Sequence, residues 1–127
     1  MLPFVVRFKS GKPVYEQVLL AVKRALIAGQ LKPGDRFPSV RVLSQELRIN
    51  PNTAHKIIST LIEDGLLKIQ PGVGTVIGEI RPATAQQKQE LLDQDIERLV
   101  VDARMLSLGL EDLLPAVQKT WQRLVKE

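Results

Sequence analysis

Cysteine is absent from this 127-residue sequence, and histidine occurs once, as His55. The absence of cysteine excludes disulfide bonds, thiolate metal sites and cysteine nucleophiles. One histidine is too few for a multi-histidine metal site. No apolar run approaches the roughly 18 residues that a membrane-spanning helix needs, and the N-terminus lacks the apolar stretch of a signal peptide. We therefore expect a cytoplasmic protein with no metal, no cofactor and no membrane partner.

Catalytic constellations are missing as well. No nucleophile–base pair and no phosphate-binding loop occurs in the sequence. Gly72-Val73-Gly74 resembles part of a dinucleotide-binding fingerprint, but it lies between two predicted strands instead of between a strand and a helix. Tyr15 and Trp121 are interpreted as packing residues. The sequence gives no support to an enzyme.

Charge is distributed unevenly along the chain, whose formal net charge is +4. Residues 1–80 carry a balance of +5, whereas residues 81–127 carry −1. A basic N-terminal part is what a polyanionic partner such as nucleic acid requires. A charge imbalance without any partner is the alternative.

Three helices are predicted in the N-terminal part from apolar residues that recur every three or four positions. The first covers residues 14–28, and the second covers residues 40–47 with Ser39 as its N-cap. The third begins at Pro51, where the missing N–H costs nothing, and Asn50 caps it. Its inward side chains are expected to be Ala54, Ile57, Ile58, Leu61 and Ile62.

A hairpin follows the third helix. Residues 66–70 and 75–77 are predicted strands, and Pro71-Gly72-Val73-Gly74 joins them. Helix, tight turn, helix and hairpin in this order are typical of the winged helix-turn-helix. The expected fold class is therefore mainly α with a small β-hairpin: an N-terminal winged helix-turn-helix, then a two-helix C-terminal segment.

Arg81-Pro82 marks the boundary between an N-terminal module, residues 1–80, and a C-terminal segment, residues 83–127. Helices predicted at 83–106 and 110–125 form an antiparallel pair that is too short to bury both of its apolar stripes internally. The segment needs the N-terminal module or a second copy of the chain. The expected dimerisation residues are the apolar side chains Leu92, Ile96, Leu99, Val100, Ala103, Leu106, Leu113, Leu114, Val117 and Trp121.

The outward face of the third helix is the strongest functional feature. Asn52 and Thr53 lie in its first turn, where a recognition helix contacts base edges. Asparagine can pair with adenine through two hydrogen bonds. Lys56 can reach a guanine or a phosphate, and His55 can do either more weakly. The alternative is the solvated polar face of an ordinary amphipathic helix.

Two flanking elements extend this candidate DNA-binding surface. Arg41 lies near the start of the second helix, just after Ser39, where backbone N–H groups favour a phosphate. The alternative for Arg41 is an ion pair with Glu46 or exposure to solvent. The hairpin tip is compatible with a backbone or minor-groove contact, or with a tight turn alone. The tip residues are Pro71, Gly72, Val73 and Gly74.

Taken together, these motifs resemble the bacterial GntR family of transcription regulators. The matching segments are Pro13-Val14-Tyr15-Glu16-Gln17-Val18, residues 29–41 and the hairpin Gly72-Val73-Gly74-Thr75-Val76. Asn50-Pro51-Asn52-Thr53 and the short tail are similar to the YtrA-type branch, the smallest of the family. The chain departs from the pattern at His55, where many other branches have arginine.

The resemblance implies a homodimeric repressor that binds double-stranded DNA at an inverted-repeat operator, as YtrA-type members do at transporter operons. It assigns DNA contacts to Arg41, Asn52, Thr53 and the hairpin around Gly72. It names no small-molecule effector. A winged-helix module that binds another protein is the competing hypothesis, although such a helix would expose aromatic or aliphatic anchors.

Overall fold

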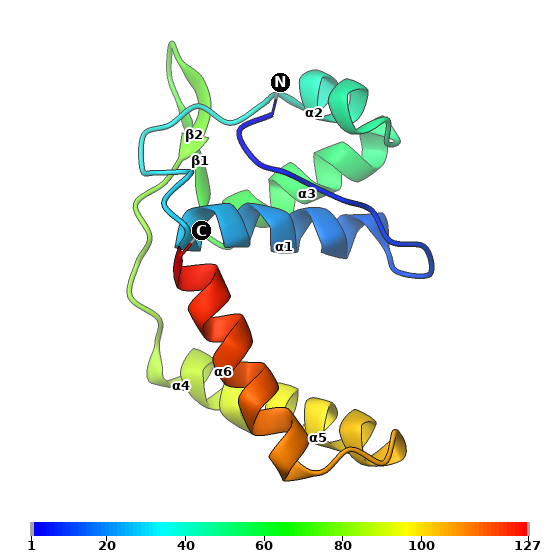
Figure 1. Ribbon diagram of the computed structural model, residues 1–127. Helices are drawn as coiled ribbons and strands as arrows, with labels where there is room; N and C mark the ends of the chain where they lie inside the picture. Colours follow the sequence, from blue (N-terminus) through cyan, green and yellow to red (C-terminus); the bar gives the residue numbers. More distant parts are fainter. Residues whose placement is uncertain (1, 127) are drawn as a thin grey trace. The chain divides into compact units, whose positions relative to one another are not determined.

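A helix-turn-helix followed by a hairpin forms the first part of the computed structural model, which describes residues 2–126 and side chains through Leu124. The elements are α1 (Val14–Ile27), α2 (Val40–Leu47), α3 (Pro51–Glu63), β1 (Leu67–Gln70) and β2 (Gly74–Ile77). Figure 1 shows the three helices stacked beside the upright hairpin. The described chain divides into two units between Ile80 and Arg81.

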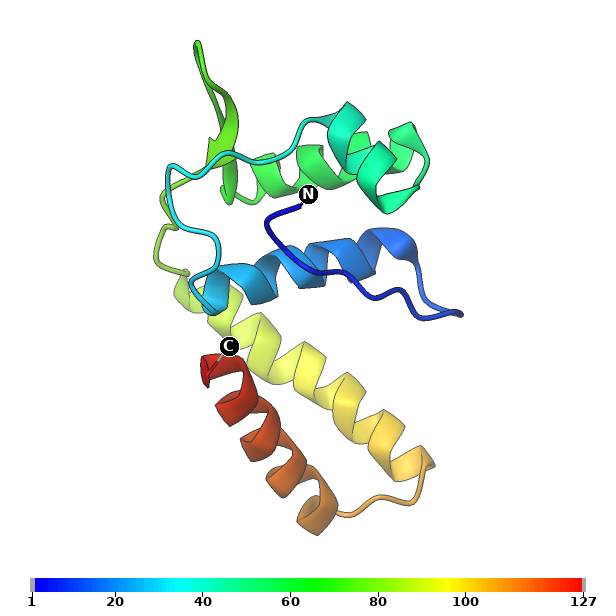
Figure 2. The same ribbon diagram turned by 45° about the horizontal axis from the view of Figure 1, so that its top comes forward.

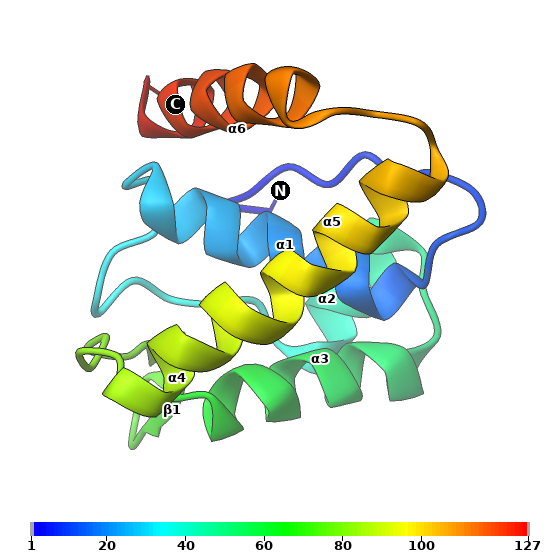
Figure 3. The same ribbon diagram turned by 90° about the horizontal axis from the view of Figure 1, so that it is seen from below.

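The core of the N-terminal unit joins all three helices to the base of the hairpin. Figure 3 shows α1 and α3 lying side by side, with the hairpin at the C-terminal end of α3. The largest fully buried side chains come from every element: Leu43, Ile57, Leu61, Leu67, Ile77, Val18, Val22 and Val76. These contacts hold α3 along one face and leave its other face open.

The N-terminal arm also contributes to this core. Phe4 is buried and stacks on Phe37, with ring centroids 5.7 Å apart and an interplanar angle of 10°. Offset aromatic pairs at this separation stabilise a core beyond their buried area. The arm therefore fixes the segment that leads into α2.

Residues 32–37 form a turn and then pair with the hairpin. The Asp35 carboxylate accepts a hydrogen bond from the Lys32 N–H at 2.9 Å and closes the turn. The chain then pairs with β2: the Phe37 N–H donates to the Thr75 carbonyl at 2.8 Å, and the Ile77 N–H donates to the Asp35 carbonyl at 2.8 Å. The hairpin thus gains a short third strand, and we call β1, β2 and this strand the wing.

The C-terminal unit is almost entirely helical. It contains α4 (Ala85–Glu90), the π-helical turn η1 (Leu91–Asp95), α5 (Ile96–Met105) and α6 (Leu110–Lys126). The helix predicted at 83–106 starts two residues later, because Thr84 and Gln87 form a capping box. The π-helical turn, which admits one extra residue, was not expected from the sequence.

Helices α5 and α6 run in roughly opposite directions (Figure 2), and their described residues make few contacts with each other. Ser107 adopts a positive φ of 62° in the connection between them. Ala103 is the one described side chain of this unit that is buried. None of the described helices combines the length and apolar character needed to cross a membrane.

The start of α3 gives a stability prediction. The Asn50 side chain accepts a hydrogen bond from the Asn52 N–H at 2.7 Å, whereas the Asn52 side chain is exposed. Asn50→Ala should lower the free energy of unfolding by about 1 kcal/mol, because an N-cap is lost. Urea denaturation followed by circular dichroism measures the change. Asn52→Ala is the matched control and should shift stability by less than about 0.5 kcal/mol; equal shifts would argue against the cap.

Candidate nucleic-acid interface

Helix α3 presents a polar face opposite its buried one. Asn52, His55 and Lys56 are exposed and Ser59 is half-buried; we call these four residues the recognition face. On the other side Ala54, Ile57, Ile58 and Leu61 are buried, as the sequence predicted, while Ile62 is half-buried. Thr53 lies at the border between the two faces and is also half-buried.

Lys56 does not stand free on this face. Its ammonium nitrogen lies 4.5 Å from the centroid of the Tyr15 ring, which belongs to α1. The Tyr15 hydroxyl shares a hydrogen bond of 2.6 Å with the Thr60 hydroxyl, one turn further along α3. Tyr15 therefore does more than pack: its ring contacts the Lys56 cation, and its hydroxyl makes a hydrogen bond to α3. This contact depends on how α1 crosses α3, so no local pattern in the sequence indicated it.

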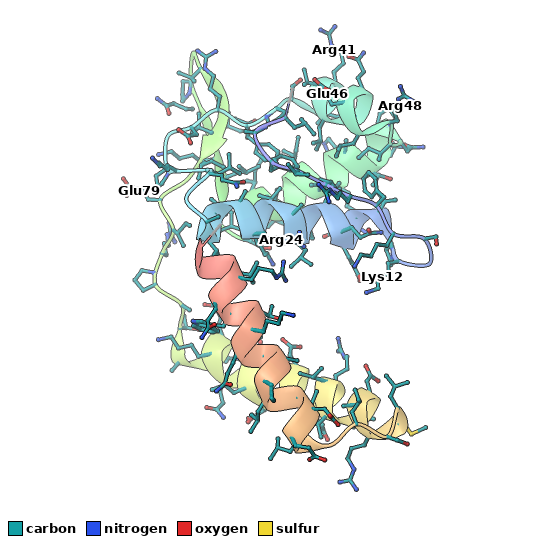
Figure 4. The ribbon with its side chains drawn as sticks, viewed as in Figure 1. Lys12, Arg24, Arg41, Glu46, Arg48 and Glu79 are labelled. Carbon is teal, nitrogen blue, oxygen red and sulfur yellow. The ribbon has the colours of Figure 1, made fainter. Side chains whose placement is uncertain are left out.

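Arg41 lies at the start of α2, the helix that packs against α3. The Ser39 hydroxyl accepts a hydrogen bond from the Val42 N–H at 3.2 Å, so Ser39 acts as the N-cap that the sequence predicted. Arg41 is exposed and extends outward from α2 (Figure 4). A cationic side chain next to the N-terminus of a helix is suited to an anionic partner such as phosphate.

Arg48 is a second basic residue at this end of the module, and the sequence analysis missed it. It is exposed and caps α2 in the left-handed conformation, with φ 55° and ψ 48°. Only a few per cent of residues other than glycine adopt a positive φ. This conformation turns the chain from α2 into α3, and Figure 4 shows Arg48 at the bend.

The tip of the wing is a tight, exposed turn. The Val73 N–H donates to the Gln70 carbonyl at 3.1 Å, and Gly72 has a φ of 78°. Proline followed by a glycine with positive φ is the signature of a type II turn. No atom lies within 4 Å of a Cβ built on Gly72 or Gly74. The glycines are therefore required by backbone conformation and not by a neighbour within the chain.

Two further basic residues flank the middle of the wing. Val76 pairs with Lys68 on β1 and with Arg36 on the added third strand. Directly opposed residues in antiparallel strands have Cβ atoms about 4.5–5.5 Å apart. Val76 is 0% exposed, whereas Lys68 and Arg36 are exposed. The two cations therefore lie on either side of a buried valine. This arrangement depends on the pairing of residues 34–37 with β2, for which the sequence has no local signal.

A helix-turn-helix with a polar recognition face, joined to a basic wing, defines a winged helix-turn-helix domain of the kind that binds DNA. Residues 14–77 match the model of the family described as bacterial regulatory proteins, gntR family. The chain belongs to the GntR family of transcription regulators, which bind DNA, and within it to the YtrA-like subfamily.

Two relatives from Bacillus subtilis (strain 168) align with most of the chain. The transcriptional repressor YtrA is 34% identical over 106 residues, which are 83% of this chain and 82% of YtrA. The transcriptional regulator YhcF is 30% identical over 112 residues, covering 88% of this chain and 93% of YhcF. A transcriptional antiterminator from Listeria monocytogenes EGD-e shares the fold: its TM-score is 0.82 at 23% identity, over 96% of this chain and 92% of that chain.

Asn52 is the best candidate for reading a base, because it is exposed in the first turn of α3. Asn52→Ala should cost about 1–3 kcal/mol on the preferred DNA and much less when one base pair of the site is changed. Fluorescence anisotropy against a set of single-base variants of the preferred duplex measures this difference. An equal loss on every duplex would rule out base reading by Asn52.

Arg41 is expected to contact a phosphate. Arg41→Ala should weaken binding to all duplexes by a similar factor and lower the slope of log affinity against log salt by about 0.9. Titrations at several salt concentrations measure that slope. A loss confined to one base position would instead identify Arg41 as a base reader.

Proposed function

We propose that this protein is a homodimeric repressor of transcription. Its N-terminal module, residues 1–80, binds double-stranded DNA, and its C-terminal segment, residues 83–127, joins two subunits. The proposal rests on the recognition face of α3. This face is open to solvent, while the opposite face of the same helix is buried in the core. A helix held in this way can enter a major groove without unfolding its module.

The charges around the recognition face support DNA as the partner. Arg41 lies at the start of α2, and Lys68 and Arg36 lie on the wing. The wing tip, Pro71 to Gly74, is exposed. Together with Asn52, Thr53, His55 and Lys56, these groups provide phosphate contacts on both sides of a helix that carries base-reading side chains.

The C-terminal segment supports dimerisation through its exposed apolar surface. Trp121 on α6 is 71% exposed, and Leu99 on α5 and Val117 on α6 are 43% and 47% exposed. Surfaces of this kind on a short helical pair mark an interaction site. The exposed or half-buried members of the proposed interface are Leu92, Ile96, Leu99, Val100, Leu106, Leu113, Leu114, Val117 and Trp121. Ala103 is already buried within one chain, so it supports the fold of the pair and contributes no surface to a partner.

Dimerisation determines the distance between the two recognition helices. Two recognition helices that enter successive major grooves on one side of the duplex must lie about 34 Å apart, one helical turn. An inverted-repeat operator, with one half-site for each subunit, matches that symmetry. The C-terminal pair sets the spacing, so a ligand that changes its packing would change affinity while the base contacts stay the same. By analogy with the YtrA-like subfamily, we propose an operon for a membrane transporter as the target.

The polar character of the recognition face argues against a module that binds another protein. A protein-binding helix would present aromatic or aliphatic anchors there, whereas this face carries Asn52, His55, Lys56 and Ser59.

Selection of bound fragments from random duplex DNA, followed by anisotropy titration at two salt concentrations, tests the proposal. We expect an inverted repeat to be enriched and binding to weaken steeply with salt. Failure to bind any duplex at low salt would favour the competing hypothesis, a module that binds another protein.

Dimerisation gives a prediction with a matched control. Val117→Asp should convert the dimer to monomers, because it buries an unpaired charge in an apolar interface. Gln118→Asp introduces the same charge at the neighbouring exposed position of α6 and should leave the dimer intact. Size-exclusion chromatography with light scattering measures the mass of each variant, and Leu99→Asp extends the test to α5. Dimers that persist in both Val117→Asp and Leu99→Asp would contradict the assigned interface.

A further inference from the structure

Tyr15 makes two contacts with α3 that packing alone does not require. Its ring lies beneath the Lys56 ammonium, 4.5 Å from nitrogen to centroid, and its hydroxyl is bonded to the Thr60 hydroxyl at 2.6 Å. Tyr15 is half-buried, Lys56 is exposed and Thr60 is half-buried. The three side chains therefore form a small cluster at the border between α1 and the recognition face.

We infer that Tyr15 is a positioning residue for Lys56, and that Lys56 contacts a DNA phosphate and not a base. This inference rests on the proposed function, because it assumes that α3 enters a major groove. The chemistry of Lys56 allows contact with either a guanine or a phosphate, and the inference selects the phosphate. It also gives Tyr15 a role in DNA binding.

The chemistry of the pair is compatible with a third, anionic partner. A lysine ammonium has three N–H donors, and an aromatic face attracts the cation without removing those donors. The N–H groups turned away from Tyr15 stay available for the oxygens of a phosphate. A free lysine side chain loses rotamer entropy when it binds DNA. A side chain that is already ordered on an aromatic ring loses less entropy on binding.

The position of Lys56 favours the backbone of the duplex. The N-terminal residues of a recognition helix contact base edges, while the first helix of the helix-turn-helix, here α2, crosses the sugar–phosphate backbone. Asn52 occupies the first turn of α3, and Lys56 lies one turn later, on the side where α1 packs. The contact with Tyr15 draws the Lys56 ammonium toward α1 and away from the first turn of α3, whose side chains face the bases. We infer that the ammonium is directed to the edge of the groove, where phosphates lie.

A double-mutant cycle with Tyr15→Leu and Lys56→Ala separates positioning from packing. Lys56→Ala should lower affinity for the selected operator and for an unrelated duplex by the same factor, and reduce the salt slope by about 0.9. Tyr15→Leu should lower affinity about two- to five-fold while Lys56 is present. In the Lys56→Ala background, Tyr15→Leu should change affinity by less than about 1.5-fold.

Two further variants keep the test independent of stability. Tyr15→Phe retains the ring but loses the bond to Thr60, so it should restore the affinity lost in Tyr15→Leu even where it lowers the melting temperature. Lys23→Ala removes an equal charge from an exposed site on α1, eight residues along the chain from Tyr15. It should leave the salt slope unchanged. All titrations are made below the unfolding transition of each variant, as measured by circular dichroism.

Three outcomes would overturn the inference. Tighter binding by Tyr15→Leu would show that the ring competes with DNA for Lys56. Equal losses in both backgrounds would show that Tyr15 acts through packing alone, and a Lys56→Ala loss restricted to one base pair would make Lys56 a base reader. If the unaltered protein ignores duplex DNA at low salt, the proposed function itself fails, which is a separate result.

Discussion

The burial of one face of α3 is the constraint on which the whole DNA-binding surface depends. Ala54, Ile57, Ile58 and Leu61 pack against α1, α2 and the base of the wing, and this fixes the rotation of the helix about its axis. With a period of 3.6 residues, this rotation turns Asn52, His55 and Lys56 toward solvent. The recognition face is therefore a consequence of the core. Its exposed residues Asn52 and His55 lie outside the buried core that holds α3 in place.

The wing is fixed to the same core by a different kind of interaction. Leu67 and Ile77 anchor its base, and the backbone pairing of residues 34–37 with β2 joins it to the segment that leads into α2. Phe37 ends that pairing and stacks on Phe4, so the wing, the N-terminal arm and the start of α2 share one packing site. The spacing between the wing tip and Arg41 is consequently set by backbone hydrogen bonds and an aromatic pair.

The three helices of the N-terminal module, the capping residues Ser39 and Asn50, and the hairpin could be predicted from local patterns in the sequence. Apolar spacing, N-cap chemistry and a Pro-Gly turn each act within a few residues. The contacts that could not be predicted are those between distant segments. Pairing of Arg36 with Val76, the stack of Phe4 on Phe37 and the contact of Tyr15 with Lys56 and Thr60 all depend on how elements cross. The π-helical turn at Leu91–Asp95 has no clear local signal either. For the candidate site, the sequence proposed Arg41, residues of α3 and the wing tip, whereas Arg36, Lys68 and Arg48 became candidates only from the structure.

In the proposed complex, two copies of α3 enter successive major grooves while the C-terminal segments join their subunits. Hydroxyl-radical footprinting on the selected operator reveals this geometry. We expect two protected regions on one side of the duplex, with their centres about one helical turn or 34 Å apart and related by the symmetry of the repeat. A single protected region, occupied by one subunit at saturation, would contradict this geometry.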